Sequence, residues 1–399
     1  MAAGGHDMVV IGAGPAGCAF AVEAAGRGFR VALLEAGARG RDKACGGGLM
    51  ADAGAALQGL DLFDSVTAHL QPAAGLRPHA PNGTGVDLNG TFYVTRRTLF
   101  DAALQDAAGR AGADLFRETR ATAVERGAEG ARVTARTPGG EAVFRGALTV
   151  LATGGAAQGL GLLSDARVRR AARGHAMRRF LTFQRPHGLT RLHLWFDRGL
   201  LPGYGWAFPV SPTVLNTGVG GPPTPAGRPP RLKHLERRLE ADNRLAGRLY
   251  RTAGTVGEAA GAPLRTGLCG APFSGERLLV VGEAAGSTYA LSGEGMGKAM
   301  ETARIAADVA DDALRRGAPT ADALAAYDHA LERRLRGLFR AYDRAQERVA
   351  RPGFVNALAR AASRSAAMRR TLEDVLAERR SPDAAFSPGG FLKHILLGG

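Results

Sequence analysis

The residues best suited to chemistry begin with a glycine turn near the N-terminus. Residues 12–17 read G-A-G-P-A-G, the spacing G-x-G-x-x-G, directly after the apolar run Met8–Ile11. The first glycine permits a tight turn, the second lets backbone N–H groups approach a pyrophosphate at a helix N-terminus, and the third lets helix and strand pack closely. Glu35 follows at the end of a second apolar run and can accept hydrogen bonds from a ribose hydroxyl. The pattern in this context predicts dinucleotide binding.

A second glycine-rich segment follows the apolar run Arg277–Val281. Residues 282–286 read G-E-A-A-G, and residues 292–297 read S-G-E-G-M-G before a long helical stretch. The N-terminus of a helix that starts here favours negative charge in front of it. An N-cap by Ser292 is the plainer interpretation of the same residues, and the two are compatible.

Two further motifs carry residues that could line a site. Residues 43–49 read K-A-C-G-G-G-L, and residues 204–209 read Y-G-W-A-F-P. Side chains alternate along a strand, so Tyr204, Trp206 and Phe208 would share one face, and Gly205 would let a ligand approach the backbone. Core packing is an even alternative for Phe208. Cys45 lies in a loop of flexible glycines, where it could be a proton donor, a redox partner or a packing residue.

The elements that must position these residues alternate between strand and helix. The apolar runs predict buried strands joined by a helix at Ala16–Gly28, a helix at Arg96–Gly112 and a long helix at Gly293–Arg316. Short alternating segments near residues 121–145 predict an antiparallel meander. Between residues 164 and 266, extended stretches separated by Pro and Gly predict a mostly antiparallel sheet, interrupted by one basic helix, Arg231–Arg251. Beyond Pro319 the chain reads as helical, with an apolar stripe from Leu324 to Tyr342.

This order predicts an α/β protein with a discontinuous Rossmann-like nucleotide-binding domain and an inserted substrate domain. The nucleotide-binding domain is expected at residues 1–75, 92–163 and 267–318. The mostly antiparallel substrate-binding domain is expected at residues 76–91 and 164–266, and a helical C-terminal region at residues 319–399.

The motifs together resemble those of a known flavoprotein family. The G-E-A-A-G and G-E-G segments resemble the second flavin fingerprint of the p-hydroxybenzoate hydroxylase-type FAD fold, with Glu283 where that fold has an aspartate that holds the ribityl chain. Arg97 with Asp101 resembles the central arginine motif of the fold. K-A-C-G-G-G and Y-G-W-A-F-P resemble the K-x-C-G-G-G and Y-x-W-x-F-P motifs of the geranylgeranyl reductase family, over most of residues 7–310.

The resemblance implies non-covalent FAD and assigns the candidate site residues. The catalytic candidates are Cys45, Tyr204 and Trp206, and the residues expected to line the substrate channel are Tyr204, Trp206 and Phe208. Those expected to hold the cofactor are Gly12, Gly14, Ala16, Gly17, Glu35, Ala36, Cys45, Gly46, Gly47, Arg97, Val124, Gly282, Glu283, Gly293, Gly295 and Met296. No metal site is expected.

Family members reduce isolated C=C bonds of long prenyl chains, so the resemblance implies an oxidoreductase that acts on a hydrophobic prenylated small molecule. The electron donor stays open between NADPH and a ferredoxin, since no second G-x-G-x-x-G marks a separate NAD(P)H domain. An aromatic hydroxylase of the same fold usually carries Asp-Gly where this chain has Thr153-Gly154. A halogenase needs a lysine in a segment where none occurs between residues 44 and 232. A flavoprotein that binds a hydrophobic ligand without turnover is the third alternative.

Composition sets the broad class and the expected surroundings. With 45% hydrophobic and 22% charged residues, the 399-residue chain reads as globular. A net charge of +15 favours anionic partners, and the basic helix with the apolar end Phe391–Leu397 suggests peripheral binding to an anionic membrane from the cytoplasm. Aromatics at 6% are too sparse for a nucleic-acid platform. Cys18 and Cys269 carry no pattern, because the three cysteines form neither a CxxC pair nor a disulfide framework. The oligomeric state cannot be derived from the sequence.

Overall fold

A six-stranded sheet forms the centre of the first half of the molecule. The computed structural model describes residues 5–155, 161–162, 173–268, 273–317 and 319–391. The strand order is β18-β19-β11-β1-β2-β7, parallel except for the edge strand β18. The bounds are β1 Met8–Ile11, β2 Val31–Leu34, β7 Asp114–Phe116, β11 Leu148–Leu151, β18 Ser274–Gly275 and β19 Leu278–Val280. The central strands are buried along their whole length, as their continuous apolar runs require.

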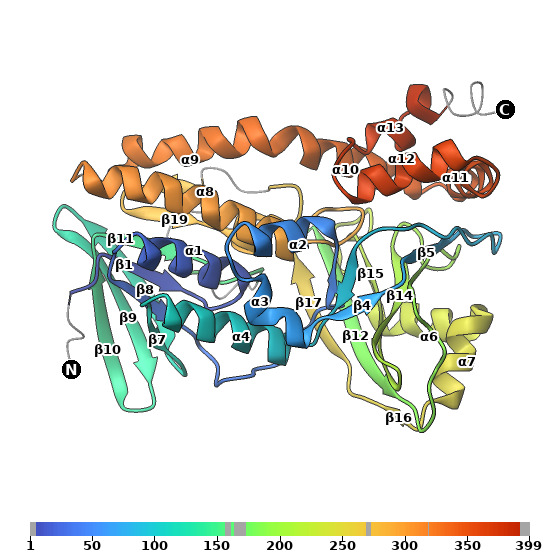
Figure 1. The fold of residues 1–399 in the computed structure, drawn as a ribbon, viewed down its shortest axis with the longest axis horizontal. Helices are drawn as coiled ribbons and strands as arrows, with labels where there is room; N and C mark the ends of the chain where they lie inside the picture. The colour runs from blue at the N-terminus through green and yellow to red at the C-terminus, as the bar shows by residue number, and fades with distance from the viewer. Residues whose placement is uncertain (1–4, 156–160, 163–172, 269–272, 318, 392–399) are drawn as a thin grey trace.

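Helices pack against this sheet and bring both glycine motifs to one edge. Helix α1 (Pro15–Gly26) packs against α4 (Arg97–Arg110) and α8 (Met296–Arg315), and α8 packs against α2 (Ala51–Gln58) and α9 (Ala321–Arg334) (Figure 1). Phe20, Phe100 and Met300 are fully buried between these layers. The helices at Ala16–Gly28, Arg96–Gly112 and Gly293–Arg316 are confirmed with ends shifted by one to three residues.

Smaller sheets complete the first half. The predicted meander is confirmed as β8 (Arg120–Gly127), β9 (Gly130–Thr137) and β10 (Gly140–Gly146), antiparallel in the order β10-β9-β8. A short sheet joins β3 (Gly48–Leu49), β6 (Phe92–Val94) and β4 (Gln71–Ala73). Two short helical segments, α3 (Phe63–Val66) and η1 (Thr67–His69), precede β4.

A second large sheet lies beside the first at the opposite end from the meander (Figure 1). Its order is β16-β12-β15-β14-β13-β5, with β17 pairing with β12, and only the β13–β5 pair is parallel. The bounds are β5 Leu76–His79, β12 Gly174–Thr182, β13 Leu192–Trp195, β14 Tyr204–Ser211, β15 Val214–Gly221, β16 Thr255–Val256 and β17 Ala260–Leu264. One face packs on helices that follow β15, and the other contributes Trp206 and Phe208 to a separate apolar cluster.

The expected single basic helix is wrong, because the chain forms two. Helix α6 (Leu232–Asp242) ends at Asn243, and α7 (Arg244–Thr252) begins directly after it. Asn243 has extended backbone, and its side-chain oxygen accepts the N–H groups of Leu245 and Ala246 at 3.1 and 3.0 Å. This N-cap separates the two helices. Leu239 and Leu249 pack against the second sheet while the basic side chains remain exposed.

The C-terminal region is helical, as expected, and its stripe belongs to two helices rather than one. Helix α9 ends at Arg334 and α10 (Arg336–Val349) follows, with a break at Leu335. Helices α11 (Pro352–Arg364), α12 (Ala366–Leu376) and α13 (Asp383–Phe386) complete the chain. Figure 1 shows α10–α13 over the second sheet. Residues of α11 and α12 share an apolar cluster with Trp206 and Phe208.

The fold agrees with the expected α/β architecture of an inserted sheet and a helical C-terminal part. The residue boundaries of the three domains stay a prediction. Cys269 and most of the apolar end, Phe391–Leu397 with Lys393, lie outside the described residues. Within the described part of the chain, every helix is too short or too polar to cross a lipid bilayer.

Candidate functional site

One cavity collects most of the predicted site residues. Its volume is about 570 Å³, and it runs from the first glycine turn, past the Cys45 loop, to the aromatic face of β14. A cavity of this size is typical of a small-molecule or cofactor site. The predicted residues that line it are Gly12, Gly14, Ala16, Glu35, Ala36, Cys45, Gly46, Gly47, Arg97, Tyr204, Trp206, Phe208, Glu283, Gly293, Gly295 and Met296.

Three predicted cofactor residues do not line the cavity. Gly17 and Gly282 instead allow neighbouring segments of the chain to pack closely against them. A Cβ at Gly17 would collide with the carbonyl oxygen of Gly12, and one at Gly282 would lie 2.7 Å from the Cβ of Ala16. Val124, on β8, packs against the apolar core around the six-stranded sheet. Its predicted contact with the cofactor therefore has no support from the cavity lining.

The first glycine turn leaves an open space at the start of α1. Gly12 has a φ of +106°, and a Cβ there would lie 2.5 Å from the carbonyl oxygen of Ala152, so only glycine fits. A Cβ at Gly14 would meet nothing closer than the guanidinium nitrogens of Arg41 and Arg97, at 3.9 and 4.0 Å. This space is bounded by helix N–H groups and two cations, and it suits a pyrophosphate.

Glu35 is buried and only half satisfied. Its Oε1 accepts the N–H of Gly37 at 2.8 Å and the Nε–H of Arg41 at 2.7 Å. Its Oε2 is buried and has no hydrogen-bond partner among the described residues. A buried acceptor without a donor is costly. The cavity beside it lets a ribose hydroxyl supply that donor, which is the role that the sequence predicts.

Arg97 is held rigidly behind the open space. Its Nε and Nη2 groups donate to the two carboxylate oxygens of Asp101 at 2.6 and 2.8 Å, and both side chains are buried. Burial lowers the pKa of the Arg97 guanidinium, but the charge of Asp101 and the nearby Cys45 sulfur outweigh it and raise the pKa. Arg97 therefore presents a permanent positive charge in a fixed place.

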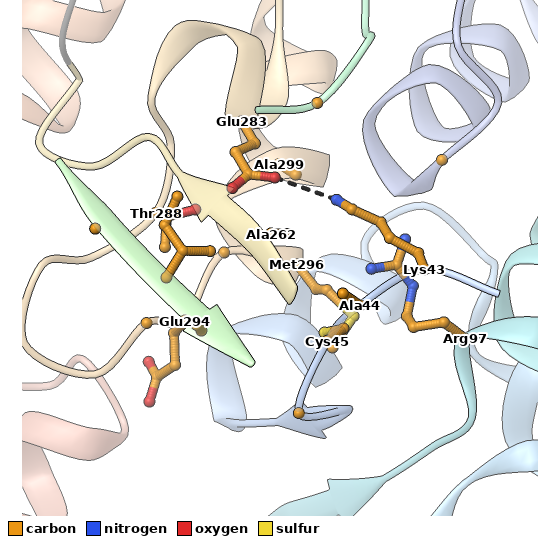
Figure 2. Close-up of a pocket in the computed structure, with 18 of the residues that line it drawn as sticks. Lys43, Ala44, Cys45, Arg97, Ala262, Glu283, Thr288, Glu294, Met296 and Ala299 are labelled. Carbon is orange, nitrogen blue, oxygen red and sulfur yellow. Dashed lines mark hydrogen bonds and ion pairs between the residues drawn. The ribbon is translucent and has the colours of Figure 1, made fainter. Parts of the chain in front are cut away.

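The second fingerprint places an acid opposite the lysine of the Cys45 loop. Glu283 Oε2 pairs with Lys43 Nζ at 3.1 Å, and Figure 2 shows Lys43 reaching toward Glu283. The other oxygen, Oε1, is buried without a hydrogen-bond partner among the described residues. It remains available to accept a hydrogen bond from a ligand hydroxyl.

The start of α8 is not capped by a side chain, so the predicted N-cap by Ser292 is wrong. The helix begins at Met296 and its N-cap is Gly295, which provides no side-chain cap. The hydroxyl oxygen of Ser292 accepts the N–H of Glu294 at 3.4 Å, within the loop before the helix. A Cβ at Gly295 would lie 2.6 Å from the hydroxyl oxygen of Thr288, so a larger residue would not fit at the N-cap. Gly295 and Met296 line the cavity, and the N–H groups at a helix start favour an anionic ligand edge there.

The Cys45 loop is fastened to the aromatic strand through Asn216. Trp206 donates its Nε1–H to Asn216 Oδ1 at 3.1 Å, and Asn216 donates to the carbonyl of Cys45 at 2.9 Å. A Cβ at Gly46 would lie 3.3 Å from the ring of Phe208, so the loop and the strand are in direct contact. The Cys45 sulfur accepts the N–H of Gly47 at 3.4 Å.

Tyr204, Trp206 and Phe208 share one face, as the period of two predicts. Neighbouring ring centroids along β14 are 6.2 Å apart, and the hydroxyl of Tyr204 donates to the carbonyl of Ser292. Burial, and then the charge of Glu294, raise the pKa of Tyr204. The prediction for Gly205 is wrong. It faces the opposite side, where a Cβ would lie 2.7 Å from Leu239 on α6, so it serves helix packing.

Sequence reasoning missed several residues of the site. Asn216 does not line the cavity, but it supports two residues that do, and as a polar residue within an apolar strand it gave a signal in the sequence. Gln346 on α10 and Leu376 on α12 line the cavity, although the helical tail had no predicted role. Nothing local in the sequence marks these two residues. Their position depends on how the C-terminal helices cross the second sheet.

These features fit FAD. The two arginines at the open glycine turn suit the pyrophosphate, Glu35 Oε2 a ribose hydroxyl, and Glu283 Oε1 a ribityl hydroxyl. The uncapped start of α8 suits the electron-rich edge of the flavin ring. The fold and the cavity together define a flavoprotein of the type with two glycine fingerprints.

Comparison with known proteins identifies the family. Residues 7–195 match the family model described as lycopene cyclase protein. The chain is 31% identical over 326 residues to the menaquinone reductase of Mycolicibacterium smegmatis, with 76% of each chain covered. It is 31% identical over 347 residues to the digeranylgeranylglycerophospholipid reductase of Methanoculleus marisnigri, with 81% of each covered.

The solved structures agree in fold. A geranylgeranyl bacteriochlorophyll reductase-like protein from Thermoplasma acidophilum has a TM-score of 0.79 at 19% identity, covering 98% of this chain and 96% of that one. A solved halogenase shares the fold at 16% identity, a likeness that extends to the fold alone. The chain belongs to the geranylgeranyl reductase-like family of FAD-dependent oxidoreductases.

Proposed function

We propose that this protein reduces carbon–carbon double bonds in a prenyl chain. The observation that supports this most directly is that one cavity is lined by polar residues on one side and by aromatic residues on the other. A polar wall with Arg97, Glu35 and Glu283 suits FAD, and the aromatic face of β14 continues it through the Cys45 loop. An apolar chain lying on that face would meet the flavin at the loop.

Bound FAD, once reduced, supplies a hydride at N5. An isolated alkene has no carbonyl oxygen to polarise, so the protein's contribution is alignment and the exclusion of water. Trp206 and Phe208 are largely buried and hold the loop by direct contact and through Asn216. Leu76, Leu194 and Leu376 extend the apolar lining. These residues would hold the prenyl chain in a fixed orientation beside the flavin ring.

The substrate class that we propose is a hydrophobic small molecule with a prenyl tail. One relative is named for menaquinone and another for a digeranylgeranyl phospholipid. These two compounds carry a prenyl tail on different head groups. The aromatic and aliphatic lining fits the shared tail. The head group has to be found by assay.

The experiment has two stages. The purified protein is first loaded with FAD, and its visible spectrum and stoichiometry are measured. The dithionite-reduced holoprotein is then mixed without oxygen with menaquinone, with digeranylgeranylglycerophospholipid or with geranylgeranyl diphosphate, and the products are analysed by mass spectrometry. After reoxidation in air, which returns any quinol ring to the quinone, we expect a mass gain of two hydrogens per reduced bond of the prenyl chain, and no gain with any of the three would overturn the proposal.

The same preparation separates the alternatives. Oxygen-dependent hydroxylation or halogenation of an aromatic substrate would identify a monooxygenase or a halogenase. Binding of prenyl compounds without any product would identify a carrier. The electron donor is tested by following flavin bleaching with NADPH and with reduced ferredoxin. Cys45→Ser keeps the size of the side chain but removes the acidity of the thiol, so it tests whether Cys45 acts chemically.

We also propose that the protein binds anionic membrane surfaces through α6 and α7. Arg237, Arg244, Arg248 and Arg251 are exposed on these helices, with few exposed acids between them. Each basic residue near an anionic surface contributes on the order of 1 kcal/mol. A prenylated substrate resides in such a membrane, so surface binding would bring the enzyme to it.

A further inference from the structure

Four ionisable groups meet beside the uncapped start of α8, and the hydride chemistry does not use them. They are Asp52 on α2, Glu294 just before α8, Lys298 in the first turn of α8 and Glu378 after α12. The Asp52 carboxylate lies so close to the helix that a Cβ at Gly297 would collide with its Oδ2. Glu294 lines the cavity itself.

The single cation in this group is already shared by other carboxylates. Lys298 Nζ lies 2.5 Å from Glu301 and 2.7 Å from Glu378, and Glu378 also accepts the hydroxyl of Tyr289 at 2.7 Å. Asp52 Oδ2, in contrast, is buried with no hydrogen-bond partner among the described residues. Among the described residues, neither Asp52 nor Glu294 forms an ion pair, although the charge of Lys298 acts on both.

This environment favours the protonated form of both groups. Burial, and then the charge of Glu378, raise the pKa of Asp52 to about 6, although Lys298 opposes the shift. Burial, and then the charges of Asp52 and Glu378, raise the pKa of Glu294 well above its ordinary value.

The other groups that face Glu294 carry no compensating charge. Tyr342 on α10 and Tyr204 on β14 both have pKa values raised by burial and by Glu294, so they stay neutral. Tyr289 is likewise kept neutral by burial and by Glu378. Glu301 is a further anion, at the solvent side of Lys298. Within this cluster, Asp52 therefore exchanges a proton close to neutral pH, next to Glu294, whose protonated form burial also favours.

We infer that Asp52 and Glu294 store the proton that the reduction of a double bond consumes. The inference rests on the proposed function. Reduction of FAD by two electrons adds a negative charge, which the start of α8 stabilises, and this charge draws one proton into the adjacent carboxyl pair. On transfer, the hydride carries its electron pair to one alkene carbon, and the stored proton leaves the carboxyl for the other carbon.

The carboxyl pair lies between solvent on one side and the cavity on the other. Glu378 and Glu301 have side chains 19% and 29% exposed, so the carboxyl cluster beside Asp52 and Glu294 reaches solvent on this side. On the cavity side, a Cβ at Gly293 would lie 2.9 Å from the hydroxyl of Tyr204, which places the aromatic wall against the residue before Glu294. The store therefore lies between solvent and the proposed prenyl chain.

The test is the pH dependence of the reduction potential of the FAD-loaded protein, measured without substrate. Each proton taken up with two electrons changes the potential by about 30 mV per pH unit, the tenfold change in proton activity converted for a two-electron couple. Wild-type protein should show about twice this slope above pH 6, for one proton on the flavin and one on the pair. The absorbance of the reduced flavin, read at the same time, must remain that of the anion.

The double variant D52N/E294Q should show the single-proton slope across the whole range, with the same anionic spectrum. D312N removes a carboxylate at the exposed far end of α8 and should keep the wild-type slope. If the double variant does not take up FAD, E294Q alone is measured, with proton uptake on photoreduction followed by a pH indicator. E294Q should take up one proton fewer than the wild type on reduction.

Two outcomes overturn the inference: a single-proton slope in the wild type above pH 6, or an unchanged slope in the variants. Neither depends on alkene turnover. A double slope that the variants lose, in a protein that reduces no prenyl substrate, would instead overturn the proposed function and leave the proton store in place.

Discussion

Replacing Gly14 with valine tests the central claim about the cofactor site. Gly14 has a φ of −86°, which any residue adopts, and a Cβ there would touch only guanidinium nitrogens at 3.9 and 4.0 Å. The folded protein therefore has room for the new side chain. That side chain would fill the space in front of α1 that a pyrophosphate needs.

The size of the effect follows from the contacts that would be lost. If two charge-assisted hydrogen bonds to phosphate fail, at about 1.5–3 kcal/mol each, binding weakens by about 3–6 kcal/mol. At 1.4 kcal/mol per factor of ten, the FAD dissociation constant should rise by about 10²- to 10⁴-fold. The thermal unfolding of the protein without added FAD should stay within a few degrees of wild type, because nothing in the protein is displaced.

Two other glycines of the same helix give matched controls. A Cβ at Gly17 would collide with the carbonyl of Gly12, so Gly17→Ala should lower stability itself, by about 1–3 kcal/mol or more. A Cβ at Gly26 would meet nothing within 4 Å, so Gly26→Ala should change neither property. The assay is equilibrium dialysis against FAD together with thermal unfolding by circular dichroism. If Gly14→Val bound FAD within threefold of wild type, the assignment of the glycine turn would be wrong.

Three further changes give separate tests. Trp206→Ala should leave FAD bound but reduce single-turnover prenyl reduction by about 100-fold, because misplacing the reacting atoms by about 1 Å costs on that order; equal turnover would remove Trp206 from the site. The wild type should co-sediment at low salt with phosphatidylglycerol vesicles and not with phosphatidylcholine vesicles, and R244E/R248E/R251E should abolish this while R132E on β9 does not. Asp52→Asn should stabilise the protein at pH 7.5 by about 1–3 kcal/mol, since the raised pKa means that ionised Asp52 costs stability as the pH rises from about 4 through 6. The gain should vanish below pH 4 in thermal melts, and a gain that stays constant with pH would contradict this cause.

The elements that sequence analysis predicted best are those whose pattern is local. Met8–Ile11, the glycine turn and α1 follow one another as expected, because a buried strand and a helix each leave a continuous signature over a few residues. The shared face of Tyr204, Trp206 and Phe208 follows from the period of a strand. Every predicted residue that carries a charge at the cofactor site lines the cavity.

The failures concern choices that only tertiary contacts decide. Ser292 is a good N-cap residue by type, but α8 begins at Met296, four residues later, and its N-cap is Gly295, which lies against Thr288. Gly205 was assigned to the ligand side, yet it lies on the face that receives Leu239. Asp52 gave no signal at all, because its importance comes from contact with a helix that starts more than two hundred residues later in the chain.

The glutamate at position 283 shows how a departure from the family pattern can be accommodated. The fold usually places an aspartate here, and the additional methylene of Glu283 extends the carboxylate toward Lys43, which it reaches at 3.1 Å. Only one oxygen is engaged, and the other stays buried without a partner among the described residues. The longer side chain can therefore bind the Cys45 loop and still accept a hydrogen bond from the cofactor. On this argument Glu283→Gln should weaken FAD binding less than Glu283→Ala, because the amide oxygen keeps the acceptor that the ribityl chain would use.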